Sequence, residues 1–322
     1  MAEKKTPSLK ISVVGGGIAG ASTALYLAEL GHQISLIDPK AESISNISLS
    51  RNGTQASLGI LMGYVYRRST GRSWKLRQRS MKLWPKLIAK INDSQNPLKI
   101  KTPLVQLAHS NEELSSMNKI ANEKHRYGVE LLNNESIEYF TEIFECNPYG
   151  GLISFQDGMI EPISLLKAIQ KCYKIYDIKT ISESVKSLKK NIKQKDWNLY
   201  LNNGDLLKQD IIIICASLES QSLLKPLGHS INLEPVLGQV LELEYQGKDI
   251  DYKKFPAVIT NQKFNLIIKK NNRFLIGATI EKGVIGRMEE KINMQNLNGY
   301  APDWIQKASI KNEWSGIRAR PT

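Results

Sequence analysis

The chain has 322 residues, 41% of them hydrophobic, and a formal net charge of +13. This composition is ordinary for a packed globular core and excludes a largely disordered chain, and the length suffices for one large domain or two interleaved ones. The basic excess is compatible with an acidic partner such as nucleic acid or anionic lipid, but asparagine-rich loops favour a general compositional drift toward lysine, isoleucine and asparagine.

Cysteines and histidines are few and scattered, so neither a metal site nor a Ser-His-Asp arrangement is predicted. Cys215 directly follows an apolar run and is interpreted as a small core residue. The uncharged stretch 11–28 contains a glycine cluster and several hydroxyl residues, which argues against a membrane span. Residues 1–10 are charged and polar and lack a cleavable-signal pattern, so a cytoplasmic protein with no membrane contact is expected.

The first predicted elements are a strand, a helix and a second strand. Leu9–Val14 is a short β-branched run, Ile18–Leu30 is followed by Gly31 as a helix-ending glycine, and His32–Asp38 alternates in polarity. The unit spans about thirty residues, the size of a mononucleotide-binding half.

The remaining elements are mixed, and they include an antiparallel series in the last third of the chain. Helices are predicted over Ser73–Ile91, which contains Pro85, and over Asn111–Arg126, Pro162–Tyr173 and Met294–Lys307. Strands are predicted over Leu104–Ala108, Val129–Leu132, Gly150–Phe155, Ser182–Leu188, Trp197–Leu201, Ile211–Ile214, Val236–Tyr245, Ala257–Ile259, Phe264–Lys269 and Phe274–Ile276, with Asp157-Gly158 as a hairpin-type turn. Ile211–Ile214 is apolar on both faces and is expected inside a sheet covered on both sides.

One motif carries chemistry: Gly15-Gly16-Gly17-Ile18-Ala19-Gly20 follows a strand and opens a helix. The first glycine allows a tight turn, the second lets the backbone approach a pyrophosphate, and the third lets helix and strand pack closely. The helix N-terminus then offers N–H groups to phosphates, and Asp38 can accept hydrogen bonds from ribose hydroxyls. The alternative is a glycine-rich turn that binds nothing, and the motif alone does not separate FAD from NAD.

Later segments, taken in order, resemble the flavin-dependent D-amino-acid oxidase and glycine oxidase superfamily. This class includes sarcosine oxidases and the oxidase domain of the bifunctional enzyme that modifies the tRNA wobble uridine. The resemblance covers 9–322 unevenly. Besides the glycine motif it is carried by Thr54-Gln55-Ala56-Ser57-Leu58-Gly59-Ile60-Leu61, Asp157-Gly158-Met159-Ile160-Glu161-Pro162, Pro235-Val236-Leu237-Gly238-Gln239, Arg273–Glu281 and Gly316-Ile317-Arg318.

The resemblance implies an α/β fold: a Rossmann-like FAD-binding domain interleaved with an antiparallel-sheet α+β substrate domain. Residues 1–95, 150–228 and 285–322 would form the FAD-binding domain, and 96–149 and 229–284 the substrate domain. FAD is the implied cofactor, with Thr54, Ser57 and Gly59 beside the flavin and Val185 contacting adenine through its backbone. The full implied set is Gly15, Gly16, Gly17, Ile18, Ala19, Gly20, Asp38, Thr54, Ser57, Gly59 and Val185.

In this class a neutral amine passes a hydride from its α-carbon to flavin, oxygen reoxidises the flavin, and the imine hydrolyses. The resemblance therefore implies a small amine or amino acid as substrate, and its carboxylate needs a cation. Arg318 is the first choice and Arg320 the second, because arginine offers a bidentate fork. The alternative is that both are solvated surface residues.

Two departures from the family pattern bear on activity. Ser217 stands where the family usually has a glycine, and its side chain is expected to crowd the dinucleotide. The chain also ends at Thr322, before a Gly-rich turn and helix that family members carry after the last signature. A truncated protein is therefore expected, and a degenerate flavoprotein-like fragment without activity is an alternative.

The segment 43–92 has no acidic residue and a cluster of basic ones: Arg51, Arg67, Arg68, Arg72, Lys75, Arg77, Arg79 and Lys82. One interpretation is a basic entrance for an anionic substrate such as an amine borne on tRNA, with Tyr64, Tyr66 and Trp74 stacking on bases. The favoured interpretation is a charged, solvated helix face, so tRNA is an alternative partner only. The oligomeric state is not predicted.

Overall fold

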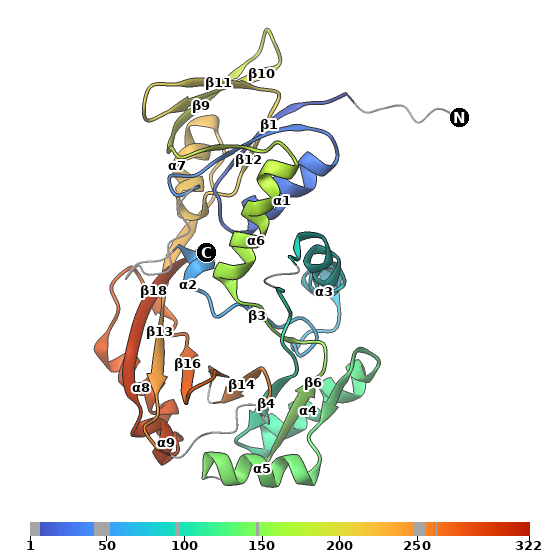
Figure 1. Ribbon diagram of the computed structural model, residues 1–322, viewed down its shortest axis with the longest axis vertical. Helices are drawn as coiled ribbons and strands as arrows, with labels where there is room; N and C mark the ends of the chain where they lie inside the picture. The colour runs from blue at the N-terminus through green and yellow to red at the C-terminus, as the bar shows by residue number, and fades with distance from the viewer. Residues whose placement is uncertain (1–6, 42–51, 94–96, 146–147, 248–254, 262) are drawn as a thin grey trace.

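The computed structural model describes residues 7–41, 52–93, 97–145, 148–247, 255–261 and 263–322. Two regions follow each other along its longest axis (Figure 1). One is built on a parallel four-stranded sheet, and the other on a mixed nine-stranded sheet, called here the large sheet. None of the helices within these ranges is long and apolar enough to cross a membrane.

The parallel sheet contains the predicted strand–helix–strand unit. Its order is β12 (Ile211–Ile214), β1 (Lys10–Val14), β2 (Gln33–Ile37) and β8 (Lys179–Ile181), and all pairs are parallel. Helices α1 (Ile18–Glu29) and α6 (Pro162–Ile175) share one apolar core with the sheet. A second apolar core lies between this sheet and a three-stranded sheet. The three strands are β9 (Val185–Asn191), β10 (Asp196–Leu201) and β11 (Leu206–Gln209). The fold class expected from the sequence is confirmed here.

The apolar run Ile211–Ile214 lies in a sheet that is covered on both faces, as predicted, and it forms an edge strand of that sheet. In the described part of the chain β12 pairs only with β1. Ile213 packs into the core on the α1 side, whereas Ile212 and Ile214 pack toward the three-stranded sheet. The run is apolar on both faces because two layers cover it, and not because strands flank it on both edges.

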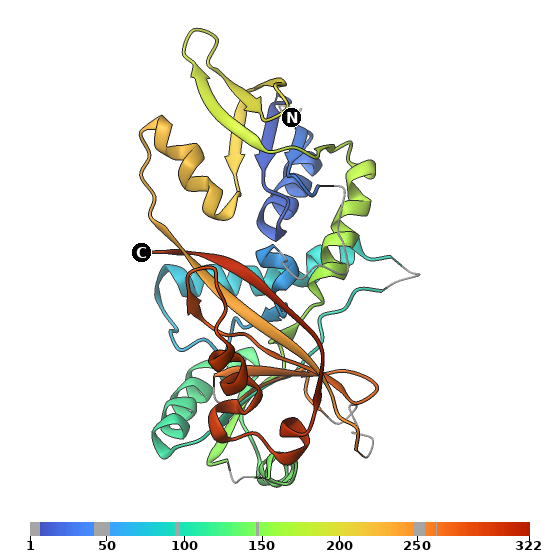
Figure 2. The same cartoon turned by 90° about the vertical axis from the view of Figure 1, so that its left-hand side faces the viewer.

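The large sheet runs in the order β17 (Glu281–Lys282), β13 (Leu233–Glu244), β16 (Arg273–Gly277), β15 (Phe264–Ile268), β14 (Val258–Asn261), β4 (Leu104–Ala108), β6 (Gly150–Ser154) and β5 (Val129–Leu131). A further strand, β18 (Ser309–Pro321), pairs along the length of β13 (Figure 2). The predicted series 236–276 is antiparallel as expected, and β14 joins β4 in parallel. The domain boundaries stay a prediction, although β6 and β18, which they assign to the FAD-binding domain, hydrogen-bond within the large sheet.

Helices α5 (Asn134–Phe144), α8 (Met288–Gln295) and α9 (Asp303–Gln306) contribute to the core on one face of the large sheet. The single helix predicted over Met294–Lys307 was wrong. Asn298 and Gly299 have left-handed backbone, with φ of 54° and 93°, and Pro302 stands at the N-cap position of α9. These residues turn the chain between two short helices.

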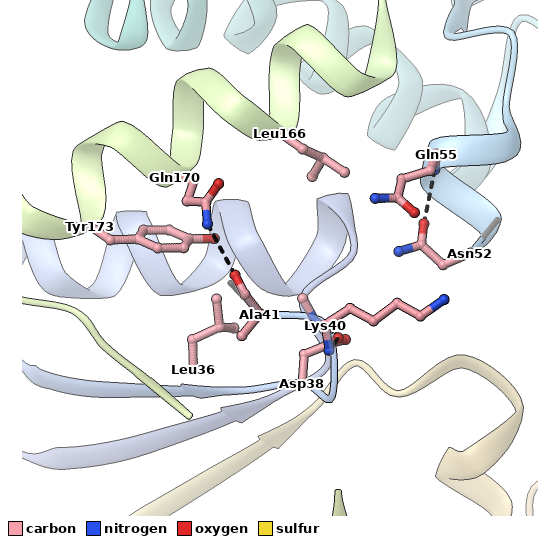
Figure 3. Close-up of a pocket in the computed structure, with 10 residues that line it drawn as sticks. Leu36, Asp38, Lys40, Ala41, Asn52, Gln55, Leu166, Gln170 and Tyr173 are labelled. Atoms are coloured by element: carbon pink, nitrogen blue, oxygen red, sulfur yellow. Dashed lines mark hydrogen bonds between the residues drawn. The ribbon is translucent and has the colours of Figure 1, made fainter. Parts of the chain in front are cut away.

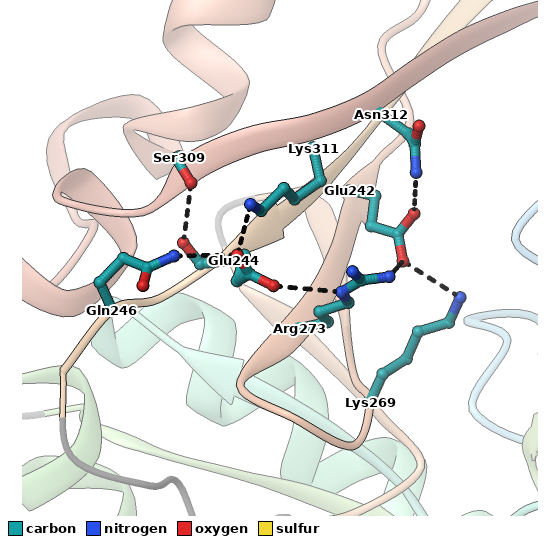
Figure 4. A network of polar contacts seen from close by, with 8 residues as sticks. All are labelled: Glu242, Glu244, Gln246, Lys269, Arg273, Ser309, Lys311 and Asn312. Carbon is teal, nitrogen blue, oxygen red and sulfur yellow. Dashed lines mark hydrogen bonds and ion pairs between the residues drawn. The ribbon is translucent and has the colours of Figure 1, made fainter.

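The other face of β13 carries Gly238 near its start and two glutamates near its end. Glu242 lies near Lys269 and Arg273 and accepts a hydrogen bond from Asn312, while Glu244 pairs with Arg273 and Lys311 (Figure 4). These contacts join β13, β15, β16 and β18, which holds the strands that carry the candidate site in register.

Candidate active site

The glycine-rich turn is shaped so that only glycine fits at two of its positions. Gly15 has a φ of +109°, and a Cβ added there would lie 2.3 Å from the carbonyl oxygen of Cys215. A Cβ on Gly20 would lie 1.8 Å from the carbonyl oxygen of Gly15. Helix α1 then begins at Ile18, and its N-cap residue Gly17 has no side chain that could cap it. The N–H of Ile18 donates to Thr54, and the neighbouring N–H groups of the turn are where a phosphate group is expected.

Asp38 lies directly beside this turn. Its Oδ2 accepts a hydrogen bond from Gly16 N at 2.7 Å, and its Oδ1 accepts one from Lys40 N at 2.8 Å. A carboxylate has about four acceptor positions, so two remain for a ligand. The carboxylate is thus oriented by the backbone and still able to bind hydroxyl groups.

A narrow cavity opens next to Asp38 (Figure 3). The side chains of α6 and those of the segment that begins at Asn52 face each other across this cavity. One of them is Tyr173, whose pKa is raised by burial and then by the charge of Asp38, so its hydroxyl stays protonated. The lining residues are Gly16, Leu36, Asp38, Lys40, Ala41, Asn52, Gln55, Leu166, Gln170 and Tyr173.

The segment 52–60 connects this cavity to the large sheet. Asn52 caps α2 (Gly53–Ala56) by accepting a hydrogen bond from Gln55 N at 2.9 Å. Thr54 Oγ1 accepts one from Ile18 N at 3.0 Å, so Thr54 contacts the start of α1. Ser57, Gly59 and Ile60 then line a second, larger cavity. One short segment therefore touches both sites, as an elongated dinucleotide would require.

The larger cavity has a volume of about 350 Å³ and lies between the segment 53–60 and the large sheet. Its lining contains two cationic side chains, Lys263 and Arg318, and no acidic residue or histidine among the described residues. The complete lining is Gly53, Ala56, Ser57, Leu58, Gly59, Ile60, Gly238, Lys263, Asn265, Ala278, Ile280, Gly316 and Arg318. A cavity of this character favours an anionic ligand.

Arg318 lies on β18 opposite Val236. Its Nη1 donates a hydrogen bond to the carbonyl oxygen of Thr279 at 3.1 Å, and a Cβ on Gly238 would lie 2.5 Å from its Nη2. Burial lowers the pKa of the Arg318 guanidinium, but arginine keeps its charge in proteins. Arg318 and Arg320 are both exposed at the surface, but only Arg318 lines a cavity, so the structure separates the two arginines that the sequence left as alternatives.

A buried polar network that the sequence did not reveal supports Arg318. Thr279 Oγ1 donates to Glu281 at 2.5 Å and accepts from Gln239 N at 2.8 Å, while Arg287 N donates to Glu281 at 2.7 Å. Burial alone would raise the pKa of Glu281, but hydrogen bonds from Thr279, Arg287 and Gln239, with the charge of Arg287, hold it below its ordinary value. The network fixes the Thr279 carbonyl that Arg318 contacts.

Asp157 orders the chain that follows the segment 52–60. It is fully buried, and its carboxylate accepts hydrogen bonds from Gly63 N, Tyr64 N and Val65 N at 2.8 to 3.0 Å. The hairpin-type turn predicted at Asp157-Gly158 was wrong, because β6 lies in the large sheet whereas β7 (Gly158–Met159) pairs with β3 (Ile60–Leu61). Aspartate is needed here for its charge, and not for a turn.

Other predicted positions fall outside the two cavities. Val185 packs with Val14 and Ile37 below the parallel sheet and lines neither cavity. Ser217 has a φ of 54°, a left-handed conformation that favours glycine. Cys215 is a free thiol packed at the edge of the α1 core. Within the described ranges, no group of three histidine, cysteine, aspartate or glutamate side chains could hold a metal ion.

The basic segment lies mainly on α3 (Gly71–Ile91) and lines neither cavity. Tyr64 and Trp74 are buried, 3% and 6% exposed, and pack around Tyr127, so they are not available to stack on bases as the alternative interpretation required. Arg77 lies 3.8 Å from the centre of the Tyr66 ring. The exposed basic residues are Arg67, Arg68, Arg72, Lys75, Arg79 and Lys82, and Arg51 lies outside the described residues.

Comparison with known proteins decides the family. The sequence profile of the FAD dependent oxidoreductase family matches residues 10–322. The chain belongs to this family. The glycine turn, Asp38 and the start of α1 are consistent with the FAD that such an oxidoreductase uses.

Solved structures with the same fold cover nearly all of this FAD-dependent oxidoreductase. Glycine oxidase from Geobacillus kaustophilus has a TM-score of 0.80 and 19% identity, with 98% of this chain and 84% of that chain covered. Iminodiacetate oxidase from Chelativorans sp. BNC1 has a TM-score of 0.79 and 18% identity, with 97% and 84% covered. L-alpha-glycerophosphate oxidase from Mycoplasma pneumoniae, with FAD bound, has a TM-score of 0.80 and 15% identity, with 98% and 84% covered.

A curated relative, D-amino acid dehydrogenase from Neisseria meningitidis, is 43% identical over 51 residues. That match spans 16% of this chain and 12% of the relative. It therefore supports the family over a short segment only.

Proposed function

We propose that this FAD-dependent oxidoreductase oxidises the C–N bond of a small amine or amino acid. The observation that carries the proposal is Arg318, a guanidinium in a cavity of about 350 Å³ whose described lining contains no acid. The same cavity is lined by Ser57 and Gly59, which follow directly on the contact between Thr54 and α1.

Each part of the site has a defined role in the proposal. Arg318 binds the substrate carboxylate through its two-pronged guanidinium, and Gly238 leaves room for that side chain. FAD, when bound, supplies the acceptor for the hydride that leaves the substrate carbon. No acid or histidine lies in the described lining, so no side chain there takes a proton from the amine, which binds in its neutral form.

The names of the similar proteins support this substrate class. A glycine oxidase, an iminodiacetate oxidase and a D-amino acid dehydrogenase are among them. Oxygen as the final electron acceptor and a cytoplasmic location are further parts of the proposal. Oxygen uptake during turnover and cell fractionation test them separately.

The first experiment is to purify the chain with added FAD and record its visible absorbance. Stoichiometric flavin bands that bleach when an amino acid is added without oxygen would support the proposal. A protein that stays colourless after incubation with FAD would contradict it and would favour a non-catalytic fragment. A protein that binds FAD but is reduced by no amine or amino acid would contradict the substrate class alone.

A second candidate function is oxidation of an amine borne on tRNA. It is favoured by the six exposed basic residues on and before α3, for which no ion pair is found among the described residues. The structure gives it less support than the first candidate, because these residues line neither cavity. Retention of the protein on immobilised tRNA at moderate salt, and loss of retention when Arg72, Lys75 and Arg79 are neutralised, tests this function.

A further inference from the structure

The larger cavity contains a second cation whose role the proposed function does not explain. Lys263 lies in the turn between β14 and β15 and lines the cavity together with Arg318. No ion pair to Lys263 is found within the described ranges, and the described lining offers no carboxylate to neutralise it. Two positive charges therefore face one cavity without a counter-charge.

The backbones that carry the two cations are separated by two intervening strands of the large sheet. Arg318 is on β18 and Lys263 directly precedes β15, and the strand order between them is β18, β13, β16, β15. Three steps of about 4.8 Å place these strands roughly 14 Å apart. Both side chains line the one cavity, and together they supply two positive charges, which match a ligand that carries two negative charges.

The local backbone gives no reason for a lysine at this position. Lys263 has a φ of 70°, a left-handed conformation that glycine and asparagine adopt more readily in tight turns. The backbone conformation thus favours glycine or asparagine at this position. What lysine adds there is a positive charge in the cavity. An ammonium is a compact point charge that binds an anion without the fork geometry of arginine.

We infer that the preferred substrate is an amine carrying two anionic groups, a carboxylate bound by Arg318 and a second anion bound by Lys263. This inference rests on the proposed function. Amino dicarboxylic acids are the simplest members of the class. Amino acids with a single carboxylate leave Lys263 without a partner in the cavity, and they bind more weakly.

The test uses two substrates that differ by a single carboxylate, sarcosine and iminodiacetate. In the FAD-loaded protein, we expect kcat/KM to be at least about tenfold higher for iminodiacetate, because a hydrogen bond to a charged group contributes that much. Lys263→Asn should remove this preference, with the value for sarcosine changing less than about threefold. Lys263→Arg should restore most of it. An equal loss for both substrates, or no loss for either, would overturn the inference.

Stability and binding controls separate this inference from the proposed function. Lys263→Asn should not lower the melting temperature, because asparagine suits the left-handed turn. Calorimetric binding of glutarate and butyrate, which cannot be oxidised as amines, should show tighter binding of the dicarboxylate in the parent protein only. If glutarate is preferred but no amine is oxidised, the proposed function fails and the two-anion site stands. If amines are oxidised without a dicarboxylate preference, the inference fails alone.

Discussion

The glycine-rich turn and the larger cavity solve the problem of ligand binding in opposite ways. The turn consists of six consecutive residues, and its shape depends on the absence of side chains at Gly15 and Gly20. The cavity is assembled from residues of five distant segments, four of which the large sheet brings together beside the segment 53–60. The turn is therefore intolerant of any added atom, whereas the cavity can lose a charged group and keep its shape.

The largest effect is expected in the turn. Gly20→Ala should destabilise the fold by about 3 kcal/mol and abolish FAD uptake, because the new methyl group would overlap Gly15 O at 1.8 Å. Gly31→Ala is the matched control: Gly31 has positive φ but open space around it, so only about 1 kcal/mol is expected. Urea unfolding and flavin absorbance measure both. A similarly small cost for the two substitutions would show that the chain around Gly20 yields to the added methyl group.

The next effect is expected in the cavity and should spare the fold. Arg318→Met should lower kcat/KM for an amino acid by about 100-fold, because a charge-assisted bidentate contact is lost. For Arg320→Met we expect kcat/KM to change by less than about threefold, because Arg320 lies on the same strand but lines neither cavity. Both variants should bind FAD as the parent does. Equal loss in the two variants would contradict the assignment of Arg318.

A smaller effect with a defined pH dependence is expected for Glu281, which is 1% exposed. The pKa of Glu281 is held below its ordinary value in the folded state, so its stabilising contribution is complete above the unfolded pKa of about 4.3. That contribution is lost as the pH falls through the lower folded pKa. Glu281→Gln should therefore cost about 2 kcal/mol at neutral pH and little in acid. Urea unfolding across pH 3 to 7 measures this, and a pH-independent cost would contradict it.

The smallest effect is expected at Ser217. This residue follows β12, the strand that pairs with β1 directly before the glycine turn. Ser217→Gly should relieve left-handed strain and raise stability by about 0.5 to 1 kcal/mol. Lys195→Gly, at a φ of 57° in the turn between β9 and β10, should give a similar gain. Only Ser217→Gly should also tighten FAD binding, since only Ser217 was expected to crowd the dinucleotide. Unchanged FAD affinity in both variants would show that the serine is tolerated.

Sequence reasoning recovered the parts of the site that depend on neighbouring residues. The turn and the helix after it were predictable because glycine spacing and the strand before it are local signals. Arg318 came from a short motif, but Arg320 lies two residues further on the same face of β18, so their separation depends on how far along the strand the cavity extends. Lys263 gave no signal, and Glu281 appeared only as the last residue of a family-like segment, because their roles depend on strand order in the large sheet. The burial of Tyr64 and Trp74 was equally invisible, since aromatic residues suit both cores and nucleic-acid surfaces.

The carboxylate of Asp157 has a consequence for local opening of the chain. It binds three consecutive N–H groups that lie more than ninety positions earlier in the sequence. Amide protons in irregular segments usually exchange with solvent within fast local fluctuations. At Gly63, Tyr64 and Val65, exchange instead requires release of a buried charge, so we expect these amides to exchange as slowly as those of the central strands. Deuterium uptake by this peptide, followed over hours, would then report on global unfolding of the whole molecule.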